Sequence, residues 1–114
     1  LLEIAAEKFT TEQGLRRAVE HGDFELLYQP EVSAVTHQVE LVEALLRWRR
    51  PDGSLASPGA FLAVAEEAGL IMQISDWVMQ SAIATAARWY REGHRHLRVA
   101  INVSPRQLLD PGFV

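Results

Sequence analysis

Hydrophobic residues at the start of the chain recur every three or four positions, which is the period of an amphipathic helix. This spacing covers residues 1–21 but is interrupted at residues 9–11, so the pattern predicts one helix ending there and a second one beginning. Thr10 or Thr11 would cap the second helix, because a threonine hydroxyl accepts a hydrogen bond from the backbone of the first turn. Gly22 follows as the stop signal.

Two strands are predicted next. Residues 24–29 form a short apolar run that Pro30 closes, and residues 38–48 form a longer run rich in large aliphatic side chains. The polar segment between them, residues 31–38, has the length of a hairpin connection. If the two strands pair through so short a link, they must be antiparallel. The longer run is typical of a strand that is buried on both faces.

A loop and a helix follow the second strand. Residues 49–58 contain two prolines and a Pro-Asp-Gly turn signal, which predict an irregular connection. Ser57 is a suitable N-cap and Pro58 a suitable first helical residue, so a helix should begin there and end at Gly69. Its buried face would consist of the apolar residues at helical spacing: Phe61, Leu62, Val64, Ala65 and Ala68.

The remaining pattern predicts a long helix, a third strand and the start of another helix. Apolar residues at spacings of three and four run through residues 71–91, and residues 97–103 form an apolar strand. Ser104 and Pro105 repeat the signal of a helix start, and that short helix would reach Leu109. Strands that alternate with helices of this size indicate an α/β protein with crossover units around a parallel sheet.

The composition is that of an ordinary globular protein: 114 residues are enough for one domain, and 48% of them are hydrophobic and 23% charged. The apolar runs are too short to span a membrane and no secretory leader opens the chain, so we expect a cytoplasmic protein without membrane contact through this segment. A formal charge of −4 argues against a surface for nucleic-acid polymers. The absence of cysteine leaves oxygen and imidazole as the metal ligands.

The histidines and tryptophans have ordinary structural explanations. His94 and His96 could face the same side of a strand, but they lie in a polar connection and are expected to be solvated. Trp48, Trp77 and Trp89 each fall on an apolar stripe. We therefore expect the three indole rings to pack in the core or between helices rather than to stack on bases.

Glu43 and Asn102 both lie near the carboxyl ends of predicted strands. In a β/α barrel these ends open onto one face, where the loops assemble the active site. A buried, unpaired carboxylate is very costly, so Glu43 should meet a cation, a hydrogen-bond network or a metal ion; the alternative is a glutamate that reaches solvent. Arg47 could form a salt bridge near Glu43, and Asn102 could cap the helix that follows it.

Several short motifs occur in order along the chain: Tyr28-Gln29-Pro30, Glu43-Ala44-Leu45 continued as Leu46-Arg47-Trp48, Pro58 with Phe61, Ala65-Glu66-Glu67 with Gly69-Leu70-Ile71, Trp77-Val78, and Asn102-Val103-Ser104 with Gln107. Together they resemble the EAL domain family, which comprises bacterial cyclic di-GMP phosphodiesterases and their catalytically silent relatives. The resemblance covers residues 10–114. It implies the amino-terminal part of an EAL-type (β/α)8 TIM-like barrel whose first strand is antiparallel to the others.

The same resemblance implies a set of site residues. Glu43 would be a catalytic residue, and Glu43 and Asn102 would be ligands to Mg²⁺ or Mn²⁺. Gln29, Leu45 and Arg47 match positions that contact the substrate, cyclic di-GMP. Two metal ions would polarise the phosphodiester and activate a water molecule, and the product would be the linear dinucleotide pGpG.

The resemblance also implies that the chain is part of something longer. Residues 1–9 would be a linker helix from an upstream sensor or diguanylate-cyclase-like domain, and residues 10–114 a partial EAL domain, because the family's later metal ligands and catalytic lysine belong after Val114. Glu66 and Glu67 would lie on an outer helix and cannot replace them. We therefore expect hydrolysis by the parent protein and none of significance by this chain alone. A silent receptor, or a regulatory interaction module, remains the alternative, and relatives often form homodimers.

Overall fold

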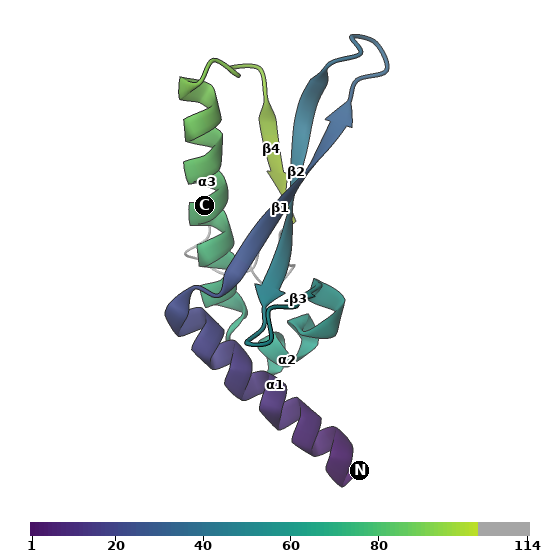
Figure 1. Ribbon diagram of the computed structural model, residues 1–114, viewed down its shortest axis with the longest axis vertical. Coiled ribbons are helices and arrows are strands. Elements are labelled where there is room, and N and C mark those ends of the chain that lie inside the picture. The colour runs from purple at the N-terminus through teal and green to yellow at the C-terminus, as the bar shows by residue number, and fades with distance from the viewer. Residues whose placement is uncertain (103–114) are drawn as a thin grey trace. The chain divides into compact units, whose positions relative to one another are not determined.

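The computed structural model describes residues 1–102, so the predicted helix from Ser104 to Leu109 lies outside the described residues. The elements in chain order are the helix α1 (Leu2–His21), the strands β1 (Phe24–Val32), β2 (Val39–Arg49) and β3 (Leu55–Ala56), the 3-10 helix η1 (Pro58–Ala60), the helices α2 (Leu62–Glu67) and α3 (Ile71–Arg91), and the strand β4 (Arg98–Ile101) (Figure 1). Within residues 1–102, none of the helices has both the length and the apolar character needed to cross a membrane.

The chain forms two compact units. The first combines Leu1–Glu25 with Leu46–Ser75, and the second combines Leu26–Leu45 with the residues from Asp76 onward. The sheet has the order β1-β2-β3, and β4 also pairs with β2. The boundary between the units therefore falls within the strands β1 and β2 and within α3.

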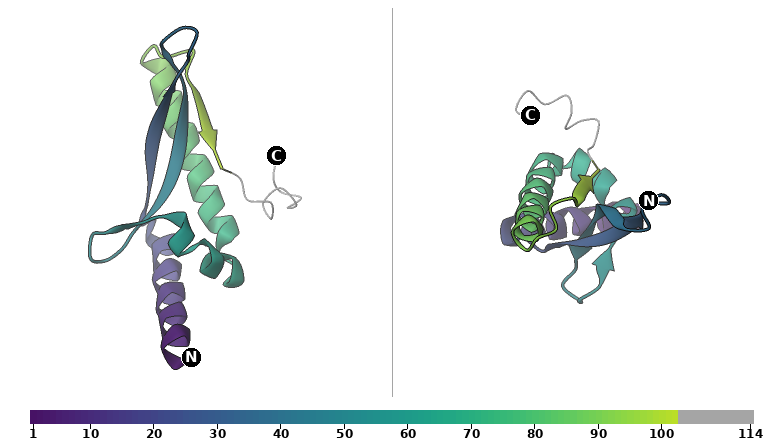
Figure 2. Two further views of the ribbon diagram at one scale, coloured as in Figure 1. Left: turned by 90° about the vertical axis from the view of Figure 1, so that its right-hand side faces the viewer. Right: turned by 90° about the horizontal axis from the view of Figure 1, so that it is seen from above.

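The sheet of the second unit has the predicted topology. β1 and β2 are neighbours joined by a short turn, and their arrows run in opposite directions (Figure 1). β4 runs parallel to β2, with Glu43 opposite Ala100 and Ala44 opposite Ile101. α3 covers one face of these strands, as both Figure 1 and Figure 2 show. The reversed first strand and the parallel crossover through α3 thus confirm the predicted α/β architecture.

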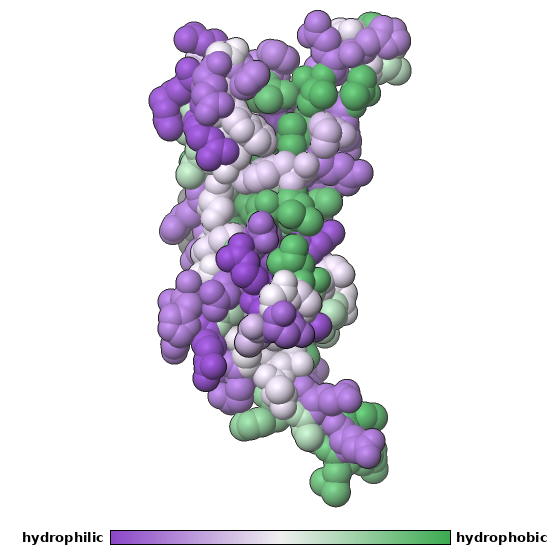
Figure 3. Space-filling model, viewed as in Figure 1, coloured by the Kyte–Doolittle hydropathy of each residue, from purple (hydrophilic) through white to green (hydrophobic). Residues whose placement is uncertain are grey.

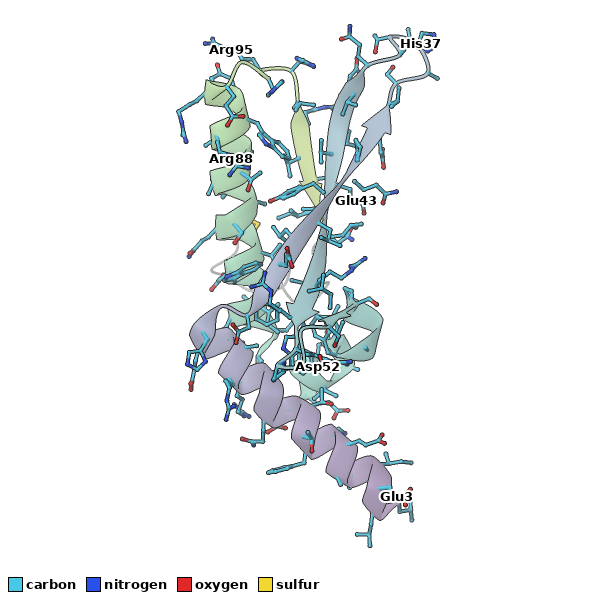
Figure 4. All side chains as sticks on the ribbon, viewed as in Figure 1. Glu3, His37, Glu43, Asp52, Arg88 and Arg95 are labelled. Carbon is cyan, nitrogen blue, oxygen red and sulfur yellow. The ribbon has the colours of Figure 1, made fainter. Side chains whose placement is uncertain are left out.

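A single serine organises the turn between β1 and β2. The Ser33 hydroxyl accepts hydrogen bonds from the backbone N–H groups of Val35 and Thr36, each at 3.2 Å. The N–H of Ser33 donates to the carbonyl oxygen of Gln38 at 2.9 Å, which closes the turn. His37, at the tip of the turn in Figure 4, has a left-handed backbone with a φ of 59°. These bonds set where the two strands begin to pair.

α1 is one continuous helix, so the predicted break at residues 9–11 is wrong. The apolar pattern changes there because the helix begins to contact the rest of its unit: residues 1–10 are exposed, whereas Leu15 and Ala18 are buried. Threonine costs a helix less than about 1 kcal/mol relative to alanine, so the two threonines do not stop it. Gly22 ends the helix as predicted, with a φ of 68°. The exposed amino end is rich in hydrophobic residues (Figure 3): Leu1, Leu2, Ile4 and Phe9.

β1 continues through Pro30 to Val32, and the prediction that Pro30 closes this strand is wrong. Among the described strands β1 pairs only with β2, so its other edge is open. A proline is tolerated on an edge strand because its missing N–H removes no hydrogen bond when it faces the open side.

The helix predicted from Pro58 to Gly69 is divided into η1 and α2, and Ser57 makes no side-chain capping bond. Phe61 separates the two helices with a φ of −141°, and its side chain is only 1% exposed. Burying a phenylalanine contributes about 1.5–3 kcal/mol, which exceeds the roughly 1 kcal/mol of a helical hydrogen bond. The helix is therefore interrupted where Phe61 enters the core, and Ala65 is the other fully buried residue of the predicted face.

β3 lies inside the segment that was predicted to be irregular. It pairs antiparallel with the end of β2, with Trp48 opposite Ala56. A two-residue strand is too short to produce a recognisable alternating pattern. The turn before it is closed by the carboxylate of Asp52, which accepts bonds from the hydroxyl of Ser54 at 2.6 Å and from its N–H at 2.8 Å. The hydroxyl of Ser54, followed by its N–H, lowers the pKa of Asp52.

Three aromatic residues pack together within the core of the first unit. The rings of Trp48 and Phe61 meet edge-on, with centroids 5.8 Å apart and an interplanar angle of 73°. Phe24 lies on the same Phe61 ring at a centroid distance of 6.5 Å. All three side chains are buried, which confirms the predicted packing role of Trp48. The guanidinium of Arg50 lies over the Trp48 ring, 5.2 Å from its centroid.

Replacing Gly14 by alanine should lower the free energy of unfolding by about 1–2 kcal/mol, although alanine favours a helix by about 1 kcal/mol. A Cβ at position 14 would lie 3.0 Å from Cζ2 of Trp48. The Trp48 ring cannot move away freely because it packs against Phe61. Urea denaturation measures the change, with Gly59→Ala as the matched control because a Cβ at Gly59 meets no atom within 4 Å. An unchanged midpoint for Gly14→Ala would contradict this packing.

Candidate functional site

The two faces of the sheet in the second unit differ in what they contact. Tyr28 of β1 and Val42 of β2 line one crevice together with Trp89 of α3. The rings of Tyr28 and Trp89 meet edge-on, with centroids 5.1 Å apart, which confirms Trp89 as a packing residue. Successive residues of a strand point to opposite faces, so Gln29 and Glu43 belong to the face away from α3. We call the face that carries Gln29, Glu43 and Leu45 the distal face.

Glu43 is half-buried and lies near the middle of β2, not at its carboxyl end as predicted (Figure 4). β2 has the predicted length but two partners along it: it pairs with β4 as far as Ala44 and with β3 from Trp48, so its parallel pairing ends well before its last residue. Glu43 is nevertheless one residue before the end of the parallel pairing, where a barrel gathers its functional residues. Within residues 1–102 its carboxylate forms no hydrogen bond or ion pair.

Asn102 directly follows the last residue of β4, as predicted, and it is exposed. Ala100 lies opposite Glu43, so Asn102 is two residues further along the neighbouring strand. With strands about 4.8 Å apart and a rise of about 3.3 Å per residue, an ideal ladder places the Cα atoms of Glu43 and Asn102 about 8 Å apart. One cation could contact both side chains at this spacing. The alternative role of Asn102, capping the next helix, involves residues outside the described part of the chain.

The three residues predicted to contact a dinucleotide lie on β1 and β2. Gln29 is exposed and Leu45 is half-buried, and both belong to the distal face of the second unit. Arg47 is the next residue of β2 with the same parity as Leu45, but it belongs to the first unit. Its Nη1 donates a hydrogen bond of 2.7 Å to the carbonyl oxygen of Leu46. The structure thus brings Gln29, Glu43 and Leu45 to one face and leaves Arg47 further along the same strand.

The donor atoms of Glu43 and Asn102 suit a hard divalent cation. Carboxylate and amide oxygens are the ligands that Mg²⁺ and Mn²⁺ prefer, and the two residues come from adjacent parallel strands. Among residues 1–102, however, no group of three or more histidine, aspartate or glutamate side chains is placed to hold a metal ion. Since Mg²⁺ favours octahedral coordination, the pair fits as part of a metal site and not as a complete one.

Other polar candidates have structural surroundings. His94 and His96 are exposed, as expected. Glu66 and Glu67 are also exposed, and the Glu67 carboxylate forms an ion pair with Lys8 of α1 within the first unit. The exposure of both residues agrees with the expectation that the two glutamates of α2 face solvent.

Sequence reasoning missed the crevice on the α3 side of the sheet. Its volume is about 310 Å³, and it is lined by Tyr28, Pro30, Val42, Trp89, Glu92, His94 and Leu97. Tyr28 and Pro30 are two residues apart on β1 and therefore lie on one face of it, which was the available signal. The prediction that the strand ends before Pro30 concealed this signal. The lining is mostly aromatic and aliphatic, with Glu92 and His94 as charged or polar members, and the crevice lies on the face of the sheet opposite the distal face.

The fold is that of the amino-terminal part of a TIM-like barrel. It has a reversed first strand, a parallel crossover, and polar residues at the end of the parallel pairing. The family model described as EAL domain matches residues 12–114. The chain therefore belongs to the EAL domain family, as its motifs indicated.

Curated and solved relatives agree with this family. The chain is 40% identical over 110 residues to the bifunctional diguanylate cyclase/cyclic di-GMP phosphodiesterase MucR of Pseudomonas aeruginosa, a match that covers 96% of this chain and 16% of MucR. A solved complex of the PaMucR phosphodiesterase with c-di-GMP matches with a TM-score of 0.86 at 39% identity, over 91% of this chain and 42% of that one. The FimX EAL domain of P. aeruginosa bound to c-di-GMP matches with a TM-score of 0.74 at 33% identity, over 90% and 40%. The chain thus spans less than half of these solved chains.

Proposed function

We propose that this chain is the amino-terminal part of an enzyme that hydrolyses cyclic di-GMP in bacterial second-messenger signalling. The observation that carries the proposal is the parallel pairing of β2 with β4 in an EAL domain, because Glu43 lies on β2 and Asn102 directly follows β4. Relatives that are named cyclic di-GMP phosphodiesterases support it, among them MucR and NbdA of P. aeruginosa and PdeR of Escherichia coli.

The proposed roles follow from the chemistry of each side chain. Glu43 and Asn102 hold Mg²⁺ or Mn²⁺, and such ions, when bound, polarise a phosphodiester and lower the pKa of a water molecule. The guanidinium of Arg47 donates hydrogen bonds to phosphate oxygens, for which its planar shape is suited. Gln29 contacts the dinucleotide through its amide and Leu45 through apolar contact. Hydrolysis of one phosphodiester bond gives linear pGpG.

The 114-residue chain by itself is proposed to lack significant hydrolysis. It offers two candidate ligands, and a hard cation binds more weakly with each carboxylate that is missing. The first turns of α1, residues 1–9, are proposed to be a linker helix that connects the EAL domain to an upstream sensor or diguanylate-cyclase-like domain in the cytoplasm. These turns are exposed, and they precede the start of the family match at residue 12.

A second candidate function is a receptor that binds cyclic di-GMP without cleaving it. The FimX EAL domain bound to c-di-GMP is one of the structures that this chain resembles. The Glu43-Ala44-Leu45 triplet favours the enzyme, because a receptor needs no metal-binding carboxylate on the distal face.

Chromatography of cyclic di-GMP after incubation with the longer protein and Mg²⁺ or Mn²⁺ separates these functions. Conversion to linear pGpG supports the enzyme. Saturable binding with unchanged cyclic dinucleotide supports the receptor. If the longer protein neither converts nor binds cyclic di-GMP, both functions are contradicted. That result would favour a module that acts through protein contacts alone.

Arg47→Ala in the longer protein should weaken the binding of cyclic di-GMP by about 10–100-fold, the loss expected for one or two hydrogen bonds to a charged group. Arg47→Lys should recover only part of this loss, because an ammonium group cannot form the paired hydrogen bonds of a guanidinium. Isothermal titration calorimetry measures the affinity, with Arg17→Ala on the exposed surface of α1 as the control. Equal affinities for the Arg47→Ala variant and the original protein would remove Arg47 from the site.

A further inference from the structure

The helix α1 touches β2 directly beside a residue of the candidate site. Within the first unit, α1 passes the carboxyl end of β2 (Figure 1). A Cβ at Gly14 would lie 3.0 Å from Cζ2 and 3.2 Å from Cη2 of Trp48. The backbone of the helix therefore lies against the indole ring with no room for a side chain between them. A displacement of α1 toward β2 has to move this ring.

Trp48 is also fixed on its other sides. Its ring meets that of Phe61 edge-on at a centroid distance of 5.8 Å, and its backbone is paired with Ala56 of β3. The N–H of the next residue, Arg49, donates a hydrogen bond of 2.9 Å to the carbonyl oxygen of Asp23, just beyond the end of α1. Because protein interiors are close-packed, pressure on the ring is passed on to the strand that carries it.

Arg47 precedes Trp48 on β2, and within residues 1–102 its side chain is held by this strand alone. Its Nη1 donates a hydrogen bond of 2.7 Å to the carbonyl oxygen of Leu46, and it forms no ion pair in the described part of the chain. Since no other described element holds the guanidinium, its position follows the backbone between Leu46 and Trp48.

We propose that Gly14 and Trp48 are positioning residues for Arg47. α1 bears on the indole ring, and the ring sets the part of β2 from which the Arg47 guanidinium reaches a phosphate of cyclic di-GMP. This inference rests on the proposed function and deepens it, because it names what controls the affinity of that site. A misplacement of about 1 Å can cost a site about 100-fold, so a shift of a few tenths of an ångström is enough to change the affinity.

Isothermal titration calorimetry of the longer protein with cyclic di-GMP tests this route. Gly14→Ala should weaken binding about three- to tenfold, a part of the loss expected for Arg47→Ala, because the hydrogen bonds to phosphate become misaligned. In an Arg47→Ala background, Gly14→Ala should have no further effect, since the group that it displaces is gone. Additive losses, or an unchanged affinity for the Gly14→Ala single variant, would overturn the inference.

Trp48→Phe provides a rescue of the same effect. Phenylalanine lacks the Cζ2 and Cη2 atoms that approach Gly14, so in this background Gly14→Ala should no longer weaken binding. A loss that persists there would overturn the inference.

Ala65→Gly controls for a general loss of stability. Ala65 is fully buried in α2 of the same unit, and glycine weakens a helix, but Ala65 is not part of the contact between Gly14 and Trp48. Binding of cyclic di-GMP by Ala65→Gly should equal that of the original protein. A loss as large as that of Gly14→Ala would mean that any weakening of the first unit lowers the affinity, and the inference would be wrong.

The same titrations separate this inference from the proposed function. If the longer protein does not bind cyclic di-GMP, both are wrong. If it binds and Arg47→Ala binds equally well, only the role of Arg47 and this inference are overturned, and formation of pGpG would still support the proposed function.

Fluorine NMR reports on the indole ring itself. With 5-fluorotryptophan incorporated, the signal of Trp48 is identified by its absence in Trp48→Phe. Cyclic di-GMP should shift this signal in the longer protein, and at saturating ligand the shift should be much smaller in Arg47→Ala, because coupling between two positions acts in both directions. No shift in the original protein, or equal shifts in the two proteins, would overturn the inference.

Discussion

Replacing Glu43 by glutamine should reduce the hydrolysis of cyclic di-GMP by the longer protein more than about 100-fold, because loss of partners that merely orient metal ligands already costs about 10–100-fold. The substitution keeps the shape of the side chain and removes the charge that would hold the cation. Glu43 has no hydrogen bond or ion pair within residues 1–102, so its loss leaves no buried partner unsatisfied there. The rate of pGpG formation should therefore fall while the thermal midpoint of unfolding changes little.

Glu40→Gln is the matched control for this experiment. Glu40 lies on the same strand and is also half-buried, but it belongs to the other face of the sheet. Its carboxylate accepts a hydrogen bond of 3.0 Å from the hydroxyl of Thr36 at the hairpin turn. Hydrolysis by Glu40→Gln should stay close to that of the original protein. Equal losses in the two variants would mean that the sheet needs negative charge for general reasons and that Glu43 has no special role.

Replacing Phe61 by alanine should lower the free energy of unfolding by about 3–5 kcal/mol. The Phe61 side chain is 1% exposed and contacts the rings of both Phe24 and Trp48, so its removal leaves a cavity at the centre of the first unit. A domain is stable by only about 5–15 kcal/mol, and this loss is a large part of the total. Chemical denaturation followed through tryptophan fluorescence should show a strongly reduced midpoint.

Phe9→Ala controls for the chemical change itself. Phe9 lies on the amino half of α1 and is 64% exposed, so its removal empties no packed space. Substitutions at such surface positions usually change stability by no more than about 0.5 kcal/mol. If Phe61→Ala were as mild as Phe9→Ala, the aromatic cluster would not be the core of the first unit.

The order of the elements was predictable because most of them are long enough to show a period. The apolar spacing of residues 71–91 matches α3 at both ends. The short link between β1 and β2 predicts their antiparallel direction, because parallel strands need a much longer connection. The apolar period of a long helix and the length of a link between two strands can both be determined from the sequence alone.

The differences arise where tertiary contacts act against local signals. An apolar pattern that changes phase at residues 9–11 indicated a helix end, but α1 continues because the change reflects where burial begins. Burial of Phe61 divided a helix whose start signals at Ser57 and Pro58 were strong. Pro30 stayed within β1, which pairs on one side only among residues 1–102. Each outcome depends on neighbours that lie far away in the sequence.

The candidate site was predicted through motifs and not through physics alone. An acidic residue within an apolar strand, at Glu43, was a visible anomaly, but the sequence did not show that Ala100 would be its neighbour on β4. The register also determines that Asn102 lies two residues beyond that neighbour. That Gln29 and Glu43 share one face follows only from the structure. Their neighbours Tyr28 and Val42 line the crevice beside α3, so Gln29 and Glu43 lie on the opposite face of the sheet.

The central claim is that the distal face, and not the crevice beside α3, binds cyclic di-GMP. Methyl NMR of the longer protein tests it most directly, because Leu45 and Val42 lie on opposite faces of the same strand, and Val42 lines the crevice. Titration with cyclic di-GMP should shift the methyl signals of Leu45 strongly and those of Val42 little, and Mn²⁺ should broaden the Leu45 signals first. Shifts that follow Val42 and leave Leu45 unchanged would contradict the account and place the ligand in the crevice.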